Sequence, residues 1–331
     1  MQQKQPTQTA LRGVFSTLAA GFDLTTRYLW LALIPAALDL FLWIGPRLSF
    51  RPLIESLAAQ LPVQDLPLDM GAMLDLYADR LNHFSYLSVS LVGVPALMSG
   101  LTPEKTPIQP QMIERAGWGE WGGYLALFTL GGLMLAAVYY SLIAYAMRRA
   151  GAAATGMAMP APRLTRRTIR TWLRLLGLGL LFLAFMVIVI FPAALLSGFV
   201  ALISQTLATV VLMGAMVFII WLIMFFSYTP QGVTLNPAGF MQSIFESVRL
   251  FRANLPASLG LLFVVTLVRR LLDIVLLAAD TGTWMTAINL LAHAYICTAL
   301  VVAMFIFYRD RYTAFLQEAR SPADATQVKQ Q

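Results

Sequence analysis

The sequence predicts an all-α, polytopic membrane protein with six transmembrane helices and additional interfacial amphipathic helices. Its 331 residues are 59% hydrophobic and only 12% charged, whereas soluble domains carry about 25% charged residues. The mean hydropathy is +0.72, so too few polar side chains are available to cover a surface in water. Lipid must therefore solvate much of the chain.

Six apolar stretches are long enough to cross the hydrocarbon core of a bilayer, which requires roughly 20 helical residues. They cover approximately residues 26–45, 121–147, 173–197, 204–229, 257–279 and 285–308. Aromatic residues mark many of their ends, as is typical of the membrane interface. Arg12 and Asp23 interrupt the N-terminal apolar positions, so we expect the first span, and not a cleaved signal, to drive insertion.

The distribution of basic residues predicts the orientation. Residues 148–172 are rich in arginine and contain no acid, which indicates a basic cytoplasmic loop by the positive-inside rule. The N-terminal tail also has a basic excess, so an even number of spans must separate the two regions. Residues 84–100 should then lie on, or dip into, the outer face. We expect both termini in the cytoplasm of a prokaryotic cell; the alternative is seven spans with the N-terminus outside.

Residues 46–120 are predicted to form an extracytoplasmic cap. This segment contains five basic and eight acidic residues, which suits the outer side of the membrane. Its apolar residues recur at helical spacing in one part, at Met70, Met73, Leu74, Tyr77 and Leu81. We therefore expect a small helical cap resting on the outer surface.

Residues 237–252 are predicted to form a cytoplasmic interfacial helix. Asn236 suits an N-cap and Pro237 suits the first helical position. An apolar stripe follows, made of Phe240, Met241, Ile244, Phe245, Val248 and Phe251. This pattern favours a helix lying in the interface with its arginines near lipid phosphates. Packing beneath the bundle is a compatible alternative.

Basic amphipathic stretches also precede the first and third spans, at residues 9–25 and 163–174. Arginines on the predicted cytoplasmic face are candidates for contact with anionic lipid headgroups. These candidates are Arg163, Arg166, Arg167, Arg170, Arg174, Arg249 and Arg252.

One short region resembles a known family. It comprises the run from Phe226 to Asn236, Phe-Ser-Tyr-Thr-Pro-Gln-Gly-Val-Thr-Leu-Asn, followed by Ser243–Ser247, Arg249–Arg252 and Asn254. It is similar to the polytopic membrane domain associated with some glycerophosphodiester phosphodiesterases and to related uncharacterised six-span prokaryotic proteins. The likeness covers about forty of the 331 residues. It implies a six-span fold and not that activity, because the soluble phosphodiesterase barrel has no counterpart in this chain.

The spans contain a few ionisable residues, which are costly within a membrane and are functional candidates by default. Arg269, Arg270 and Asp273 lie in the fifth span, and Asp39 lies in the first. Counting about 1.5 Å per residue places Asp39 and Arg269 at similar depths. We therefore hypothesise a polar cluster of Asp39, Arg269, Arg270 and Asp273 inside the bundle.

This cluster has three possible interpretations. It could line a pathway for an anionic substrate or an ion, or it could be a salt bridge that fixes helix packing. The fifth span could also end early, with its arginines at the outer interface. We favour the two structural interpretations over the pathway.

His293 and Cys297 lie four residues apart in the sixth span. This spacing places two possible ligands on one helix face, but zinc prefers three or four. We expect a buried, hydrogen-bonded histidine beside an inert thiol. The sequence contains no phosphate loop, dinucleotide fingerprint or setting for a nucleophilic serine. We therefore expect no enzyme activity, cofactor or metal.

The pattern as a whole favours a membrane scaffold or an accessory subunit of a lipid-linked or transport process. The alternative is a transporter or channel that uses the intramembrane polar cluster. Expected partners are anionic lipids on the cytoplasmic side, and a membrane-protein partner or further copies of the chain. No feature of the sequence indicates a nucleic-acid partner.

Overall fold

The computed structural model describes residues 11–60, 76–89, 92–100, 102–156, 164–236, 239–278 and 281–328. The protein is 81% helical, which makes it all-α. The first part of the chain forms α1 (Val14–Arg27), η1 (Leu29–Ala32), α2 (Leu33–Ile44), β1 (Arg47–Ser49), α3 (Arg51–Ala58), η3 (His83–Leu87), η4 (Leu97–Ser99) and β2 (Met112–Glu114). The second part forms α5 (Trp118–Thr155), α6 (Leu164–Ala201), α7 (Gln205–Phe226), α8 (Thr229–Leu235), α9 (Phe240–Ala253), α10 (Leu255–Leu277) and α11 (Thr286–Val328).

Several of the described helices are long and apolar enough to cross a membrane. Four meet this description, namely Trp118–Thr155, Leu164–Ala201, Gln205–Leu235 and Thr286–Gln317. The number is five if α1 and the following η1–α2 segment are counted as one bent span. The predicted fifth span, 257–279, corresponds to α10, which is not counted with them. The structure thus supports a multi-pass membrane protein with four or five such helices.

The predicted first span, 26–45, is not one straight helix. The chain bends by 94° between α1 and the η1–α2 segment, and Tyr28 lies at the bend with φ −128° and ψ 59°. The hydroxyls of Thr25 and Thr26 bond back to the carbonyls of Gly21 and Phe22, an arrangement that weakens and bends helices. The bend separates the amphipathic α1 from the apolar α2.

The packed body of the protein is formed mainly by α2, α5 and α11, with α1 lying across α11. A Cβ atom added at Gly21 of α1 would lie 2.5 Å from the carbonyl oxygen of Ala299 on α11. The side chains of Trp43, Tyr139 and Phe305 are fully buried at the centre. The Tyr139 hydroxyl donates to Thr298 Oγ1 at 3.0 Å and so ties α5 to α11.

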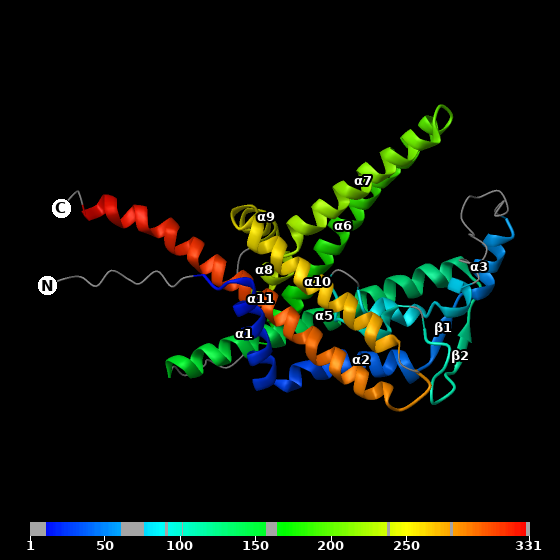
Figure 1. Ribbon diagram of the computed structural model, residues 1–331, viewed down its shortest axis with the longest axis horizontal. Helices are drawn as coiled ribbons and strands as arrows, with labels where there is room; N and C mark the ends of the chain where they lie inside the picture. The colour runs from blue at the N-terminus through cyan, green and yellow to red at the C-terminus, as the bar shows by residue number, and fades with distance from the viewer. Residues whose placement is uncertain are drawn as a thin grey trace.

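Helices α6 and α7 form an antiparallel hairpin that projects away from this body (Figure 1). Only 6% of the residues in the most apolar part of α6 are buried, and the share for α7 with α8 is 11%. The corresponding share in α11 is 67%. The hairpin therefore presents apolar side chains that the rest of the described chain does not cover.

The segment between α2 and α5 differs from the predicted helical cap because it contains a sheet. Strands β1 and β2 pair in parallel, with Leu48 opposite Ile113. Leu48, Phe50 and Leu53 form a small buried cluster beneath them. Of the predicted helix around Met70–Leu81, residues 76–80 are helical and 61–75 lie outside the described part. The helical spacing of the apolar residues between Met70 and Leu81 does not predict this pairing, because the two strands lie far apart in the sequence.

The described part of residues 84–100 forms short turns, including the end of η3 and all of η4, and contains no spanning helix. Val94, Leu97 and Met98 are buried in the main core. A Cβ atom at Gly132 of α5 would lie 2.6 Å from the Leu87 carbonyl oxygen. This segment therefore fills one end of the bundle.

The structure places two other boundaries differently from the sequence prediction. The predicted loop 148–172 is largely helical, because α5 continues to Thr155 and α6 begins at Leu164. Gly156 closes α5 with a φ of 67°, which glycine adopts without strain. Helix α9 begins at Phe240 after the N-cap Gly239. Asn236, the predicted N-cap, instead ends α8.

The two ends of the bundle are distinct (Figure 1). The start of α1 and the later part of α11 lie together near α9, and we call this the α9 end. Strands β1 and β2 with α3 lie at the opposite end, which we call the sheet end. The beginning of the described chain and the end of α11 thus share one side of the molecule.

Candidate functional site

The most buried ionisable pair joins α2 to α11. Asp39 is fully buried, and its Oδ1 accepts a hydrogen bond of 2.8 Å from the backbone N–H of Met98. Its Oδ2 lies 3.2 Å from Nδ1 of His293, which is equally buried. Three separate elements, α2, η4 and α11, therefore meet at one carboxylate.

The other ring nitrogen of His293 faces two further groups. Its Nε2 lies 3.2 Å from Sγ of Cys297 and 3.8 Å from Oδ1 of Asp273 on α10. Asp273 is 35% exposed and pairs at 3.8 Å with Arg270, which is 79% exposed. The polar groups thus run from the closed interior at Asp39 to the outside of α10.

This arrangement places one imidazole between two carboxyl groups. An imidazole can accept a proton at one nitrogen and release one at the other, and its usual pKa allows this near neutral pH. Intramembrane chains of Asp, Glu and His are a recognised device for carrying protons. The same contacts can also serve as a fixed link between three helices.

The structure brings together part of the predicted cluster of Asp39, Arg269, Arg270 and Asp273. Asp39 and Asp273 both face His293, and Arg270 pairs with Asp273. Arg269 makes no ion pair within the described part of the chain and lies close enough to Tyr139 and Tyr140 to interact electrostatically. Of the four residues in the predicted cluster, Arg269 is therefore the one that the described contacts do not join to the others.

Sequence reasoning missed His293 as the partner of Asp39. Both residues lie near the sheet end of their helices, about 8 to 10 Å from it at 1.5 Å per residue. The depth argument used for Arg269 could therefore have found His293. His293 is buried and hydrogen-bonded, as expected, and its partners are Asp39 and Cys297. Cys297 is buried as a free thiol.

A second polar cluster holds α8 and α9 against α11 at the α9 end. Glu246 of α9 accepts hydrogen bonds from Asn236 at 2.8 Å, Tyr308 at 3.2 Å and Tyr312 at 3.3 Å. Arg174 of α6 donates to the carbonyls of Val233 and Asn236 at the end of α8. These contacts explain why Asn236 terminates α8: its amide is held by Glu246 and Tyr308.

The face of α9 also differs from its predicted stripe. Ser243 and Ser247 face the bundle and are fully buried, and Ser247 donates to the Phe225 carbonyl at 2.9 Å. Met241 and Phe245 are exposed instead. Small serines allow α9 to approach the bundle closely, which leaves these two larger apolar side chains on its open face.

The predicted headgroup arginines have different surroundings. Arg166, Arg170 and Arg252 are exposed, and Arg167 is half-buried. Arg249 is exposed and stacks over the Phe315 ring at 3.9 Å. Arg174 is engaged by α8, as described above, and Arg163 lies outside the described residues. The exposed arginines of this set are therefore at the start of α6 and on α9.

Among the described residues, no group of three or more His, Cys, Asp or Glu side chains is arranged to hold a metal ion. Compared with protein-family models, with curated proteins and with solved structures, the chain finds no match. A function must therefore be argued from the chain's own residues.

Proposed function

We propose that the protein is a six-span protein of a prokaryotic cytoplasmic membrane with both ends in the cytoplasm. The predicted first span, 26–45, and α10 would add two crossings to the four described above. The arginine-rich ends of α5 and α6 would then face the cytoplasm by the positive-inside rule. This orientation puts the α9 end inside and the sheet end outside. Both described ends of the chain lie at the α9 end (Figure 1), which fits an even number of crossings.

We further propose that the protein serves as a scaffold or accessory subunit of a lipid-linked or transport process, without catalysis of its own. The observation that carries this proposal is the contrast between the packed α11 and the uncovered α6–α7 hairpin. A hairpin can stand in lipid because its backbone hydrogen bonds are satisfied internally. Its separation from the body leaves two apolar helices available to a membrane partner or to a second copy.

Site-specific photo-cross-linking tests the scaffold role. A photoreactive residue at Met216 of α7 would probe the hairpin, and one at Phe263 of α10 would probe the body; these side chains are 67% and 66% exposed. We expect discrete protein adducts from position 216 in native membranes and mainly lipid adducts from position 263. Lipid adducts alone at both positions would contradict the proposal.

Proton-coupled transport is the second candidate, and the Asp39–His293–Asp273 arrangement favours it. The closed surroundings of Asp39 and His293 favour the structural role over a water-filled path. The transport and scaffold roles can be separated by measuring proton flux into liposomes that contain the reconstituted protein and a pH-sensitive dye. The scaffold proposal predicts proton flux no faster than in protein-free liposomes. Flux that the Asp39→Asn variant abolishes would favour transport instead.

The resemblance of residues 226–254 to a phosphodiesterase-associated membrane domain stays a prediction. Lipid contact by the exposed arginines is likewise part of the proposal. Under the proposed orientation, Arg166, Arg170 and Arg252 lie on the cytoplasmic side, where anionic headgroups attract basic side chains by about 1 kcal/mol each.

A further inference from the structure

Arg311 is a buried cation on α11 at the α9 end. It is 5% exposed, and its guanidinium carbon lies 3.3 Å from the centre of the Phe307 ring. Its Nη2 donates to the backbone carbonyl of Arg12 at 3.3 Å. Its Nε and Nη1 are buried and have no hydrogen-bond partner. Most of its donor capacity is therefore unused.

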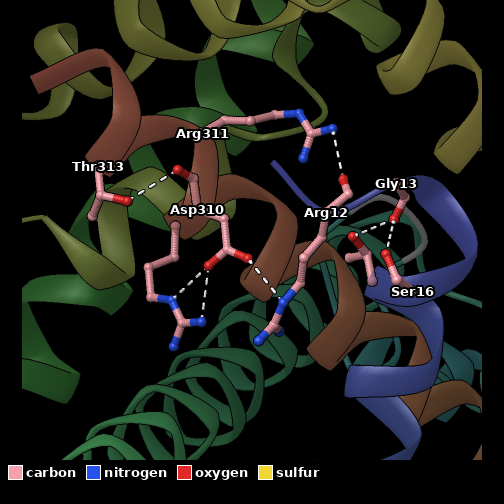
Figure 2. Close-up of polar contacts among 8 residues, drawn as sticks. Arg12, Gly13, Ser16, Asp310, Arg311 and Thr313 are labelled. Carbon is pink, nitrogen blue, oxygen red and sulfur yellow. Dashed lines mark hydrogen bonds and ion pairs between the residues drawn. The ribbon is translucent and has the colours of Figure 1, made fainter. Parts of the chain in front are cut away.

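The nearest acid in the sequence, Asp310, acts on Arg311 at longer range but makes its ion pairs with two other arginines. The carboxylate of Asp310 lies 3.8 Å from Arg12 Nε and accepts from Arg309 at 2.9 and 3.1 Å. Figure 2 shows Asp310 pointing toward the guanidinium of Arg12, while Arg311 extends to the other side, toward the Arg12 carbonyl. Within the described part of the chain, three arginines thus share one carboxylate.

A second unused donor belongs to the same packed group. The hydroxyl of Tyr228 is buried and makes no hydrogen bond of full geometry, although the Ser258 hydroxyl lies close to it. Its ring stacks on Phe307 with the centroids 5.3 Å apart and the planes inclined by 16°. Phe307 is therefore shared by Tyr228 and Arg311. Buried donors are almost always paired in native proteins, and a guanidinium left unpaired is more costly than a neutral group.

The position of Arg311 along α11 indicates which ligand could accept hydrogen bonds from its unpaired N–H groups. The apolar helix Thr286–Gln317 has 32 residues, more than the roughly 20 that cross the hydrocarbon core. Counting from Thr286, the helix leaves the hydrocarbon near residue 306 and reaches the level of the headgroup phosphates at Arg311. A guanidinium fork matches two phosphate oxygens at once.

We propose that Arg311 anchors a site for the phosphate group of an anionic phospholipid, with Tyr228 and Arg12 as further donors. The exposed, non-helical segment Leu11–Gly13 covers the site. It is held there by the Arg12 carbonyl on Arg311 and the Arg12 side chain on Asp310. Phosphate would replace the carbonyl and accept from both arginines. This inference goes beyond the scaffold role and requires only that this end of α11 lies at a membrane surface.

Lipid-dependent thermal unfolding of the purified protein tests the site. Detergent micelles would be doped with phosphatidylglycerol, with phosphatidylcholine or with neither, and a separate arm would contain inorganic phosphate. We expect phosphatidylglycerol to raise the unfolding midpoint more than phosphatidylcholine does. Arg311→Met should require about tenfold more phosphatidylglycerol for the same rise. The matched control Arg149→Met removes an exposed arginine at the same end and should respond like the wild type.

The outcomes separate the possible ligands. A rise with inorganic phosphate that equals the rise with phosphatidylglycerol, and that Arg311→Met abolishes, would identify free phosphate as the ligand and overturn the lipid assignment. An equal lipid response in Arg311→Met and the wild type would overturn the site itself. So would the absence of any response in the wild type.

Two further variants keep the test decisive if Arg311→Met fails to fold. Arg311→Lys retains the charge but lacks the planar fork, so its lipid response should be several-fold weaker. Tyr228→Phe removes one buried hydroxyl without opening a cavity, so the lipid-free protein should fold normally and respond more weakly to lipid. Wild-type responses in both variants would contradict the proposal.

Discussion

Oδ2 of Asp39 lies 3.2 Å from Nδ1 of His293, although 254 residues separate the two in the chain. Both side chains are fully enclosed between α2 and α11. Removing one partner of a buried hydrogen-bonded pair leaves the other unsatisfied, which costs about 1–3 kcal/mol and more where the group is charged. This contact therefore fixes the N-terminal helices to the C-terminal helix more specifically than apolar packing can.

A double-mutant cycle should reveal the coupling between Asp39 and His293. We expect Asp39→Asn and His293→Gln each to lower the free energy of unfolding in detergent, and the double variant to lose less than the two losses added together. The difference should fall within about 0.5–3 kcal/mol, as for residues in one polar network. Chemical unfolding followed by tryptophan fluorescence measures all three variants.

Arg269 provides the control for this cycle because it is an ionisable residue of another predicted span, α10, and makes no ion pair with Asp39 within the described chain. Asp39→Asn and Arg269→Gln should therefore be additive to within about 0.5 kcal/mol. Additivity for Asp39 with His293, together with coupling between Asp39 and Arg269, would contradict the pairing of Asp39 with His293.

The contact between α1 and α11 should not tolerate a methyl group at Gly21. An added Cβ would lie 2.5 Å from the Ala299 carbonyl oxygen and 2.8 Å from Ala303 Cβ. Overpacking of this kind costs about 1–3 kcal/mol, so Gly21→Ala should lower the thermal unfolding midpoint. Gly214→Ala is the matched control, because a Cβ there meets nothing within 4 Å. An equal midpoint in both variants would contradict the close packing of α1.

His83 should make the segment at the sheet end sensitive to acid. Its Nδ1 lies 3.1 Å from the Leu48 carbonyl and its Nε2 is buried without a partner. Burial lowers the pKa of His83 from its usual value of 6.5. The unfolded chain therefore binds a proton more readily than the folded protein, so stability is complete above pH 6.5 and declines as the pH falls below it.

Thermal unfolding between pH 5 and 8 tests this expectation. His83→Asn keeps an amide donor near the Leu48 carbonyl and removes the titrating ring, so the difference in midpoint between wild type and variant should shrink toward acid pH. A difference that stays constant across this range would show that His83 does not cause the acid sensitivity.

The apolar helices could be predicted from sequence because their length and composition are local properties. The predicted stretches 121–147 and 173–197 lie within α5 and α6. The stretch 285–308 lies within α11 except for its first residue, and 204–229 largely coincides with α7. The bend at Tyr28 was not predictable from hydropathy, because hydropathy reports the composition of a segment and not the direction in which its helix runs. Its cause lies in the threonine side chains that precede it and in the packing of Gly21 against α11.

Only part of the candidate site could be predicted, because only part of it follows from local properties of the sequence. Charge within a span identified Asp39 and Asp273, but it could not identify their common neighbour, because His293 is uncharged in a simple count. The parallel pairing of β1 with β2 depends on residues more than sixty positions apart, and the buried serines of α9 depend on the approach of α8. Such features arise from tertiary contacts that no local pattern encodes.

Cysteine labelling on intact cells tests the central claim most directly, that the chain is a multi-pass membrane protein with the α9 end inside. The single native thiol, Cys297, is buried, so introduced cysteines can be read individually. Ile108 near the sheet end and Ala253 at the α9 end are both exposed.

With a membrane-impermeant maleimide, we expect Ile108→Cys to react on intact cells and Ala253→Cys to react only after permeabilisation. Reaction of Ala253→Cys on intact cells, or protection of Ile108→Cys until permeabilisation, would contradict the account.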